Sequence, residues 1–311
     1  MKDRELKSTV LLLIAALIWG VAFVAQEIGA GYVDAFTFLS MRSWLSFFVL
    51  LPVIAWKTRA ARQEEPSREN GREDRRMLLI GGACTGFFLF AASAAQQIGI
   101  ATTTAGKSSF ITAMYVVLVP VVSVIFRKRP PAKVWFCVVM AVAGLYLLCM
   151  SGKLQIVSGD LWTLLAALLF AFQILLIHRF VGKVDGVKLT CAEFFFEAVL
   201  ATACVPFFAG GLTADSIVKA LPSILYAGLF SGGIGYTLQT LGEKHVSPPI
   251  ASLAMCMESV FGALAGWLIL HERFSVRELS GCGLMFLAIL LAELPIDRLL
   301  KGDRHEATEE L

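Results

Sequence analysis

The chain has 311 residues, of which 57% are hydrophobic and 16% charged, and its mean hydropathy is +0.74. Soluble domains carry about 25% charged residues, and the apolar residues of this chain are grouped in runs of membrane length, so a soluble protein is excluded. The net charge of +3 says little by itself. All seven cysteines lie inside apolar runs and none forms a C-x-x-C pair, so neither a disulfide framework nor a thiolate metal site is expected.

Ten apolar segments follow one another, each close to the roughly 20 residues that cross about 30 Å of hydrocarbon as a helix. The first follows three basic residues as a signal peptide would, but no small-x-small cleavage site comes after it, and we interpret it as a membrane helix. The sequence therefore predicts an all-α polytopic membrane protein. The predicted helices are 9–29, 35–56, 77–99, 104–126, 133–151, 160–178, 188–209, 220–242, 248–270 and 276–294.

The basic residues predict the orientation. With the N-terminus inside, 21 of the 27 Lys and Arg fall in cytoplasmic segments and four fall outside, as the positive-inside rule requires. Both termini are then cytoplasmic, including a polar tail at 298–311. The charged segment 57–76 is expected to be a mobile cytoplasmic loop. The predicted location is the cell membrane, plasma or bacterial inner.

Internal similarity relates the two halves of the chain. A shift of 151 residues places 13–20 on 164–171, and it also brings Val33-Asp34 onto Val184-Asp185. A shift of 143 residues places Ala113-Met114 on Cys256-Met257 and therefore Tyr115 on Glu258. Several such matches in corresponding helices indicate a duplicated unit.

The duplicated unit predicts the architecture. Residues 1–151 and 152–297 would each hold five helices, and because five is odd the second half enters the membrane from the opposite side. Inverted repeats of this kind place a binding site near the bilayer midplane, with alternating access by rocking of one half on the other.

Charged residues at depth in the predicted helices are the candidate site. A charge in the hydrocarbon costs roughly 2.5–3.5 kcal/mol on insertion scales, so it is expected to face a cavity or a partner. Glu258 is central in its helix. Glu193 and Glu197 are four residues apart and share one helix face; Glu197 is the deeper, and Glu193 is interpreted as a gate or a solvated residue. Arg42 is expected to pair with a glutamate, to contact substrate or to extend outward to the headgroups.

Other candidates are less specific. Lys107, near the outer end of its helix, either captures substrate or extends outward to the headgroups. Candidates for the cavity lining, each with packing or interhelical hydrogen bonding as the alternative, are Trp19, Tyr115, Tyr236, Gln96, Gln97, Gln173 and Gln239. Pro120 breaks one helical hydrogen bond and is a candidate hinge, with a static kink as the alternative.

Motifs for chemistry are missing from the sequence. We find no P-loop, H-E-x-x-H, G-x-S-x-G or dinucleotide fingerprint, so an enzyme is not expected, and no catalytic residue, metal site, cofactor or nucleic-acid partner is predicted. The four histidines are scattered at helix ends and in polar segments. The expected partners are a small-molecule substrate, the lipid bilayer and protons.

Three segments resemble a known family. They are Ala-Ala-Leu-Ile-Trp-Gly at 15–20, Ala-Gly-Lys-Ser-Ser-Phe-Ile-Thr-Ala-Met-Tyr-Val-Val-Leu-Val-Pro at 105–120, and Met-Glu-Ser-Val-Phe-Gly-Ala-Leu-Ala-Gly-Trp-Leu-Ile-Leu-His-Glu at 257–272. Over residues 8–295 the sequence resembles the drug/metabolite transporter superfamily, specifically the EamA type. The resemblance implies a ten-helix carrier of small metabolites, built from two inverted five-helix repeats. It also implies that helices five and ten are peripheral and that the other eight surround the cavity.

The functional prediction is a secondary carrier, an exporter of a small polar or amphipathic solute such as an amino acid. In this hypothesis Glu258 or Glu197 loses water in one facing state and takes up a proton, which couples proton movement to transport. The alternatives are facilitated exchange without protons, an uptake permease of the same fold, and a membrane sensor or assembly protein that does not transport. The sequence does not distinguish a monomer from a homodimer.

Overall fold

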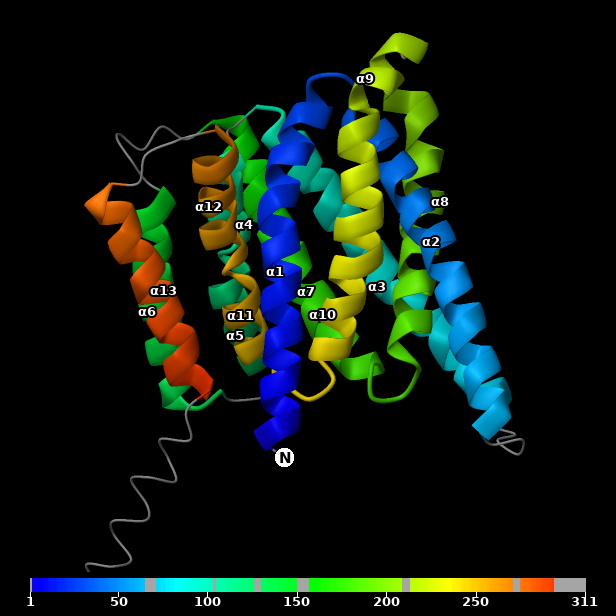
Figure 1. Cartoon of the computed structure of the whole chain (residues 1–311), viewed down its shortest axis with the longest axis horizontal. Coiled ribbons are helices and arrows are strands. Elements are labelled where there is room, and N and C mark those ends of the chain that lie inside the picture. Colours follow the sequence, from blue (N-terminus) through cyan, green and yellow to red (C-terminus); the bar gives the residue numbers. More distant parts are fainter. Residues whose placement is uncertain are drawn as a thin grey trace, which may run out of the picture.

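The computed structural model describes residues 2–64, 71–102, 105–125, 130–149, 157–208, 213–270 and 275–293. Every statement about the fold refers to these residues, which are helical except for short turns (Figure 1). The helices are α1 (Lys2–Ala30), α2 (Ala35–Glu64), α3 (Gly71–Ile100), α4 (Ala105–Thr112), α5 (Tyr115–Ile125), α6 (Ala132–Cys149), α7 (Ser158–Phe180), α8 (Gly186–Phe208), α9 (Ala214–Leu225), η1 (Tyr226–Gly235, a π-helix), α10 (Tyr236–Gly242), α11 (Pro248–Met255), α12 (Glu258–Leu270) and α13 (Val276–Glu293).

These helices make ten crossings of the bundle. Within the described residues, eight segments are long and apolar enough to span a membrane, and two shorter apolar helices, Ala132–Leu148 and Leu279–Ala292, lie at the predicted fifth and tenth positions. Three of the eight are composite: α4 with α5, α9 with η1 and α10, and α11 with α12. The all-α prediction with ten spans is confirmed, with boundaries within a few residues except at the ends of α1, α2, α3 and α9.

The prediction of a loop over 57–76 is wrong for most of its length. The backbone of α2 stays helical to Glu64 and that of α3 is helical from Gly71, so only 65–70 lies outside the described residues. Arg, Ala, Gln and Glu dominate these helix extensions, and they are good helix formers whether or not lipid surrounds them. The predicted half boundary at 151/152 and the tail 298–311 lie outside the described residues.

The two predicted repeats share their helix breaks. One composite helix is interrupted by a turn at Ala113-Met114 and the other by a turn at Cys256-Met257, the two dipeptides that the 143-residue shift aligns. Tyr115 and Glu258 therefore each begin the second segment of a broken helix. Discontinuous helices in corresponding positions are typical of the inverted repeats of transporters, and they leave polar backbone near the midplane.

The two halves also match at the N-terminus of their second helices, α2 and α8. Asp34 Oδ1 accepts hydrogen bonds from the backbone N–H of Phe36 and Thr37, both at 3.0 Å. Asp185 Oδ1 accepts from Val187 at 3.0 Å and from Lys188 at 3.1 Å. Each aspartate satisfies two N–H groups that a helix start leaves free, so the matched Val-Asp pairs perform the same task.

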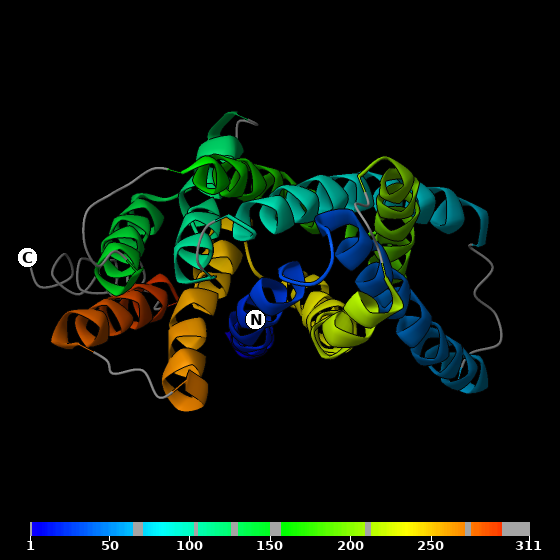
Figure 2. The ribbon, with the colours of Figure 1, turned by 90° about the horizontal axis from the view of Figure 1, so that it is seen from above.

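The packing follows the two-fold relation of the halves. α3 packs against α7, and correspondingly α1 packs against α9, η1 and α10, while α2 packs against α8. α6 and α13 pack on each other and lie at one end of the molecule, away from α1 near its middle (Figure 2). This peripheral position agrees with the one that the resemblance implies.

Glycines set the closest approaches. A Cβ on Gly20 of α1 would lie 2.5 Å from the backbone N of Gly262 in α12, so the two backbones touch at this crossing. Ser46 of α2 donates to the carbonyl of Gly228 in η1 at 2.9 Å, and a Cβ on Gly232 would collide with the Ser46 hydroxyl. Small residues at such crossings are common in membrane helices. The irregular η1 begins where the predicted helix 220–242 becomes rich in glycine.

Candidate functional site

A cavity lies between the halves at the level of the helix breaks. It holds about 40 Å³ of space accessible to water, enough for several water molecules, since one needs at least about 10–15 Å³. Its walls come from α1, α2, α3, α4, α5, α7, η1, α10, α11 and α12. α8 contributes no lining residue, so seven of the eight spans that the resemblance places around the cavity reach it. Its polar side chains are Arg42 and Glu258, the amides Gln26, Gln96, Gln173 and Gln239, and the hydroxyl groups of Thr112, Tyr115 and Ser231.

Glu258 and Tyr115 meet across the cavity. The Tyr115 hydroxyl donates to Glu258 Oε1 at 3.1 Å, and both side chains are buried. Because each residue starts the segment after a helix break, this hydrogen bond joins the two equivalent points of the repeats. Both residues line the cavity, and their part in binding substrate or protons stays a prediction.

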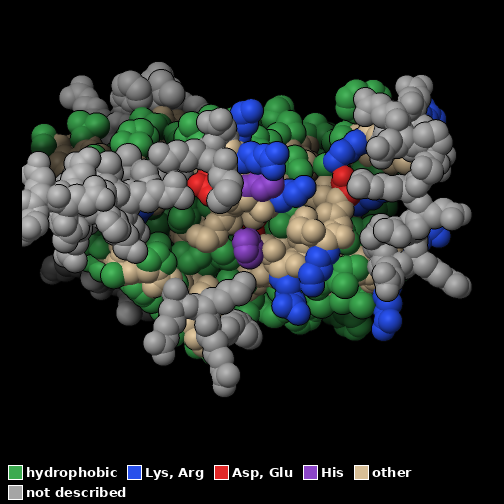
Figure 3. Space-filling view, turned by 90° about the horizontal axis from the view of Figure 1, so that it is seen from below, with side chains coloured by type: hydrophobic (Ala, Val, Ile, Leu, Met, Phe, Trp, Pro, Cys, Tyr) green, Lys and Arg blue, Asp and Glu red, His purple; other side chains and the backbone are tan. Residues whose placement is uncertain are grey.

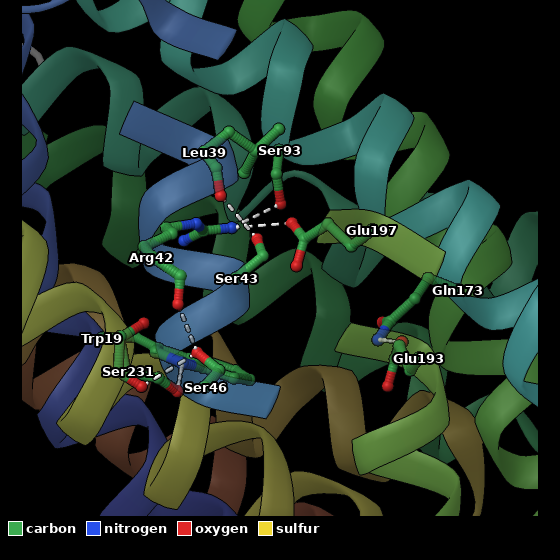
Figure 4. Close-up of polar contacts among 11 residues, drawn as sticks. Trp19, Leu39, Arg42, Ser43, Ser46, Ser93, Gln173, Glu193, Glu197 and Ser231 are labelled. Atoms are coloured by element: carbon green, nitrogen blue, oxygen red, sulfur yellow. Dashed lines mark hydrogen bonds and ion pairs between the residues drawn. The ribbon is translucent and has the colours of Figure 1, made fainter. Parts of the chain in front are cut away.

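Arg42 forms the predicted buried pair, and its partner is Glu197. Arg42 Nη2 donates to Glu197 Oε1 at 3.0 Å and to the hydroxyl of Ser93 at 2.9 Å. Figure 4 shows the guanidinium between α2, α3 and α8, pointing at these two groups. Its Nε is buried and has no partner, and Arg42 also lines the cavity. The predicted ion pair with a glutamate is therefore present, and contact of Arg42 with substrate stays a prediction.

Glu197 does not line the cavity. Its side chain is 0% exposed behind Arg42, and its Oε2 has no hydrogen-bond partner. α8 therefore contacts the cavity residue Arg42 without lining the cavity itself.

Glu193 is buried, so one of its two predicted roles, that of a solvated residue, is wrong. Its side chain is also 0% exposed, and its Oε1 accepts from Gln173 Nε2 at 2.8 Å, to one side of the Arg42 pair in Figure 4. Gln239 Nε2 donates to Gln173 Oε1 at 3.3 Å and to Glu243 Oε1 at 2.8 Å. The position of Glu193 near a helix end suggested that its side chain reaches water. Side chains of α7 and α10, however, lie against this part of α8.

Aromatic side chains supply the apolar part of the lining. Trp19 donates from Nε1 to the carbonyl of Ser231 at 3.4 Å, and its ring lies 4.9 Å from that of Tyr236. Phe23 and Phe170 complete the aromatic lining. The predicted position of Trp19 and Tyr236 agrees with the structure, as does that of Gln96, Gln173 and Gln239.

The remaining predicted residues have different outcomes. Gln97 is buried outside the cavity, where its Nε2 donates to the carbonyl of Gln26 at 3.2 Å. Lys107 belongs to α4, but its side chain lies outside the described residues. Pro120 is buried inside α5, and the helix break precedes it, at Ala113-Met114. Its role as a hinge stays a prediction.

Sequence reasoning missed two polar residues. Gln26 lines the cavity, and Glu243 is 0% exposed beyond the last residue of α10. Both stand near the ends of apolar runs, where a polar side chain is ordinarily exposed. The spacing of Gln239 and Glu243, four apart on one helix face, was the signal that could have indicated a shared environment.

The lower face, on the side of the N-terminus in Figure 1, is rich in Lys and Arg side chains (Figure 3). Lys57 Nζ of α2 lies 2.6 Å from Asp185 Oδ2, and so joins the halves on this face. Burial by itself raises the pKa of Asp185, but hydrogen bonds from Lys57 and from the Lys188 backbone, with the charges of both lysines, outweigh it and lower the pKa below its ordinary value.

The described residues contain no group of three or more His, Cys, Asp or Glu that could hold a metal ion. The polar groups of the cavity are hydrogen-bond donors and acceptors with one fixed cation and one carboxylate. Such a lining suits binding of a small polar solute.

Comparisons with known proteins agree with this arrangement. The model of the EamA-like transporter family matches residues 6–150 and 157–294, one match in each half. An uncharacterized transporter of Archaeoglobus fulgidus is 24% identical over 92% of this chain and 85% of its own length. The uncharacterized transporter YoaV of Bacillus subtilis is 22% identical over 91% of this chain and 95% of its own.

One solved crystal structure has the same fold. It superposes with a TM-score of 0.72 at 15% identity, over 94% of this chain and 98% of that chain.

Proposed function

Because this chain belongs to the EamA-like transporter family and is a multi-pass membrane protein, we propose that it is a secondary carrier for a small zwitterionic, amphipathic metabolite such as an amino acid. The observation that carries the proposal is the Tyr115–Glu258 hydrogen bond at the cavity, which joins the two helix breaks. Alternating access occurs around this point as the halves rock on each other.

The lining supports a zwitterion. Arg42 keeps its Nε free beside the cavity and can donate to a substrate carboxylate, while Glu258 can accept an ammonium group. The two charges are fixed by partners in the protein, Glu197 and Tyr115 respectively. Trp19 and Tyr236 offer aromatic faces for the apolar part of the substrate.

Glu258 is the proposed coupling residue. Removing water from a carboxylate favours its protonated form, and a carboxyl group that has taken up a proton no longer attracts an ammonium group. Proton and substrate therefore compete for Glu258, which is the basis of antiport. An inward proton gradient then drives export, and the basic lower face is cytoplasmic in this proposal, as the positive-inside rule expects. Glu197 is the weaker candidate because Arg42 already neutralises it.

The experiment is transport in proteoliposomes with an imposed pH gradient and a panel of labelled neutral amino acids. Wild type is expected to move at least one of them against its gradient. Glu258→Gln keeps downhill exchange but loses the dependence on the pH gradient. Asp215→Asn, at an exposed carboxylate paired with Lys219, is the matched control and behaves as wild type. Full gradient-driven transport by Glu258→Gln would refute the coupling role.

A further inference from the structure

A second set of buried polar side chains lies away from Glu258. We call Gln173, Glu193, Gln239 and Glu243 the lower cluster. They form one hydrogen-bonded chain, in the order Glu193, Gln173, Gln239, Glu243, with distances of 2.8, 3.3 and 2.8 Å. The chain connects α8, α7 and α10. Its two central amides also line the cavity, so the lower cluster forms part of the cavity wall.

The lower cluster has unused oxygen atoms. Glu193 Oε2, Gln239 Oε1 and Glu243 Oε2 are buried and have no hydrogen-bond partner among the described residues. Both glutamates are 0% exposed and Gln239 is 1% exposed. A buried carboxylate that is ionised and has no cation beside it is very costly, so the ionised form of these two carboxyl groups would need a positive species beside it.

The protein does not supply that species within the described residues. No ion pair joins Glu193 or Glu243 to a lysine or arginine there. Glu197, one turn from Glu193 on α8, is negative and takes Arg42 for itself. His178 of α7 lies beside Glu243, with its Nδ1 3.1 Å from the backbone carbonyl oxygen of that residue.

The contacts that α10 makes with α1 and α8 at this level, within the described residues, involve uncharged groups. On α1, Ser8 and Leu12 face Gly242, and on α8 the hydroxyl of Thr190 donates to that of Thr240 at 2.8 Å. Tyr236, at the start of α10, packs edge-on against Phe194 of α8. The other titratable neighbours of Glu243 are His178 and the exposed Lys244 and His245, and a proton on each of the two carboxyl groups neutralises them without a further ligand.

We propose that Glu193 and Glu243 form a second proton-binding site, separate from Glu258, that is occupied when α10 is packed against α7 and α8. Loss of the protons places two negative charges in a buried layer between α8 and α10, which favours their separation and opens the cavity on the lower side. This consequence for transport rests on the function proposed above, whereas proton binding itself does not.

The test uses the purified full-length protein without substrate, so it is independent of any transport result. Infrared difference spectra across a pH titration report the carbonyl stretch of protonated carboxyl groups. Wild type is expected to show protonated carboxyls at neutral pH, and Glu193→Gln and Glu243→Gln should each remove one of the signals. Asp215→Asn, at an exposed site, should remove none.

Thermal stability gives a second readout. Gln resembles a protonated Glu in size and hydrogen bonding, so the double variant should keep its melting temperature as the pH rises from 6 to 9, while wild type loses stability. Spectra that are identical in wild type and both single variants would overturn the proposal. So would a signal that follows the sodium concentration at constant pH, because the site would then bind a metal cation.

Discussion

Replacing Arg42 by Gln tests the buried pair. The substitution leaves Glu197 as a carboxylate that is 0% exposed and has lost its cation. Removing one partner of a buried ion pair typically costs about 3–5 kcal/mol, and the low exposure of both side chains, 5% and 0%, places this pair in that range. The free energy of unfolding, from denaturant titration in detergent at pH 7, should fall by about this amount.

Two controls separate the charge from the loss of packing. The double variant Arg42→Gln with Glu197→Gln removes both charges and should recover most of the loss. Glu197→Gln alone keeps a carbonyl oxygen for Arg42 and should cost less than Arg42→Gln. The single Arg42→Gln variant should also regain stability at acidic pH, where Glu197 takes up a proton. If the double variant is as unstable as Arg42→Gln and acid has no effect, the reasoning is refuted.

Three further predictions concern other parts of the fold. Gly232→Ala places a Cβ against the hydroxyl of Ser46 and 2.9 Å from the Cβ of Ser46, and should lower the free energy of unfolding by about 1–3 kcal/mol. The control is Gly283→Ala, where a Cβ would meet nothing within 4 Å, and it should cost nothing. Equal losses in the two variants would contradict the close packing at Gly232. Asp185→Asn should cost roughly 0.5–1 kcal/mol at neutral pH. Since the pKa of Asp185 is lowered in the folded state, that difference from wild type is present above the unfolded pKa of about 3.9 and vanishes as the pH falls through the folded value; a constant difference down to pH 2 would contradict it. Tyr115→Phe removes the donor to the coupling carboxylate and should move the pH dependence of transport upward by about one unit; an unchanged profile would exclude a role for this hydrogen bond.

The helices could be predicted from the sequence because lipid imposes a length and a composition on each of them. The helix breaks were not predicted, because the sequence indicated continuous helices over 104–126 and 248–270; the 143-residue shift only aligned the two positions at which the breaks lie. Ala113-Met114 and Cys256-Met257 carry no glycine or proline, and the obvious breaker, Pro120, lies inside α5. At each break the backbone N–H bonds to a carbonyl three residues back, as Met114 does to Ile111 and Met257 to Ala254, and the residue types at these positions carry no signal for that change.

The partner of Arg42 illustrates a second limit. Glu193 and Glu197 lie one turn apart on the same face of α8, and the sequence gives no reason to prefer either. A small rotation of α8 decides that Glu197 meets Arg42 and that Glu193 meets Gln173. Glu243 was overlooked for a related reason, because its burial depends on α7 and α1 and not on its neighbours in the chain.

The most direct test of the account is whether the cavity opens to both sides of the membrane in turn. Ser231 lines it and projects from the glycine-rich η1, so Ser231→Cys in a background without the seven native cysteines provides a reporter. A membrane-impermeant thiol reagent should label this cysteine from either side in proteoliposomes, and a transported amino acid should slow both reactions. Labelling from one side only, under every pH and substrate condition, would contradict alternating access.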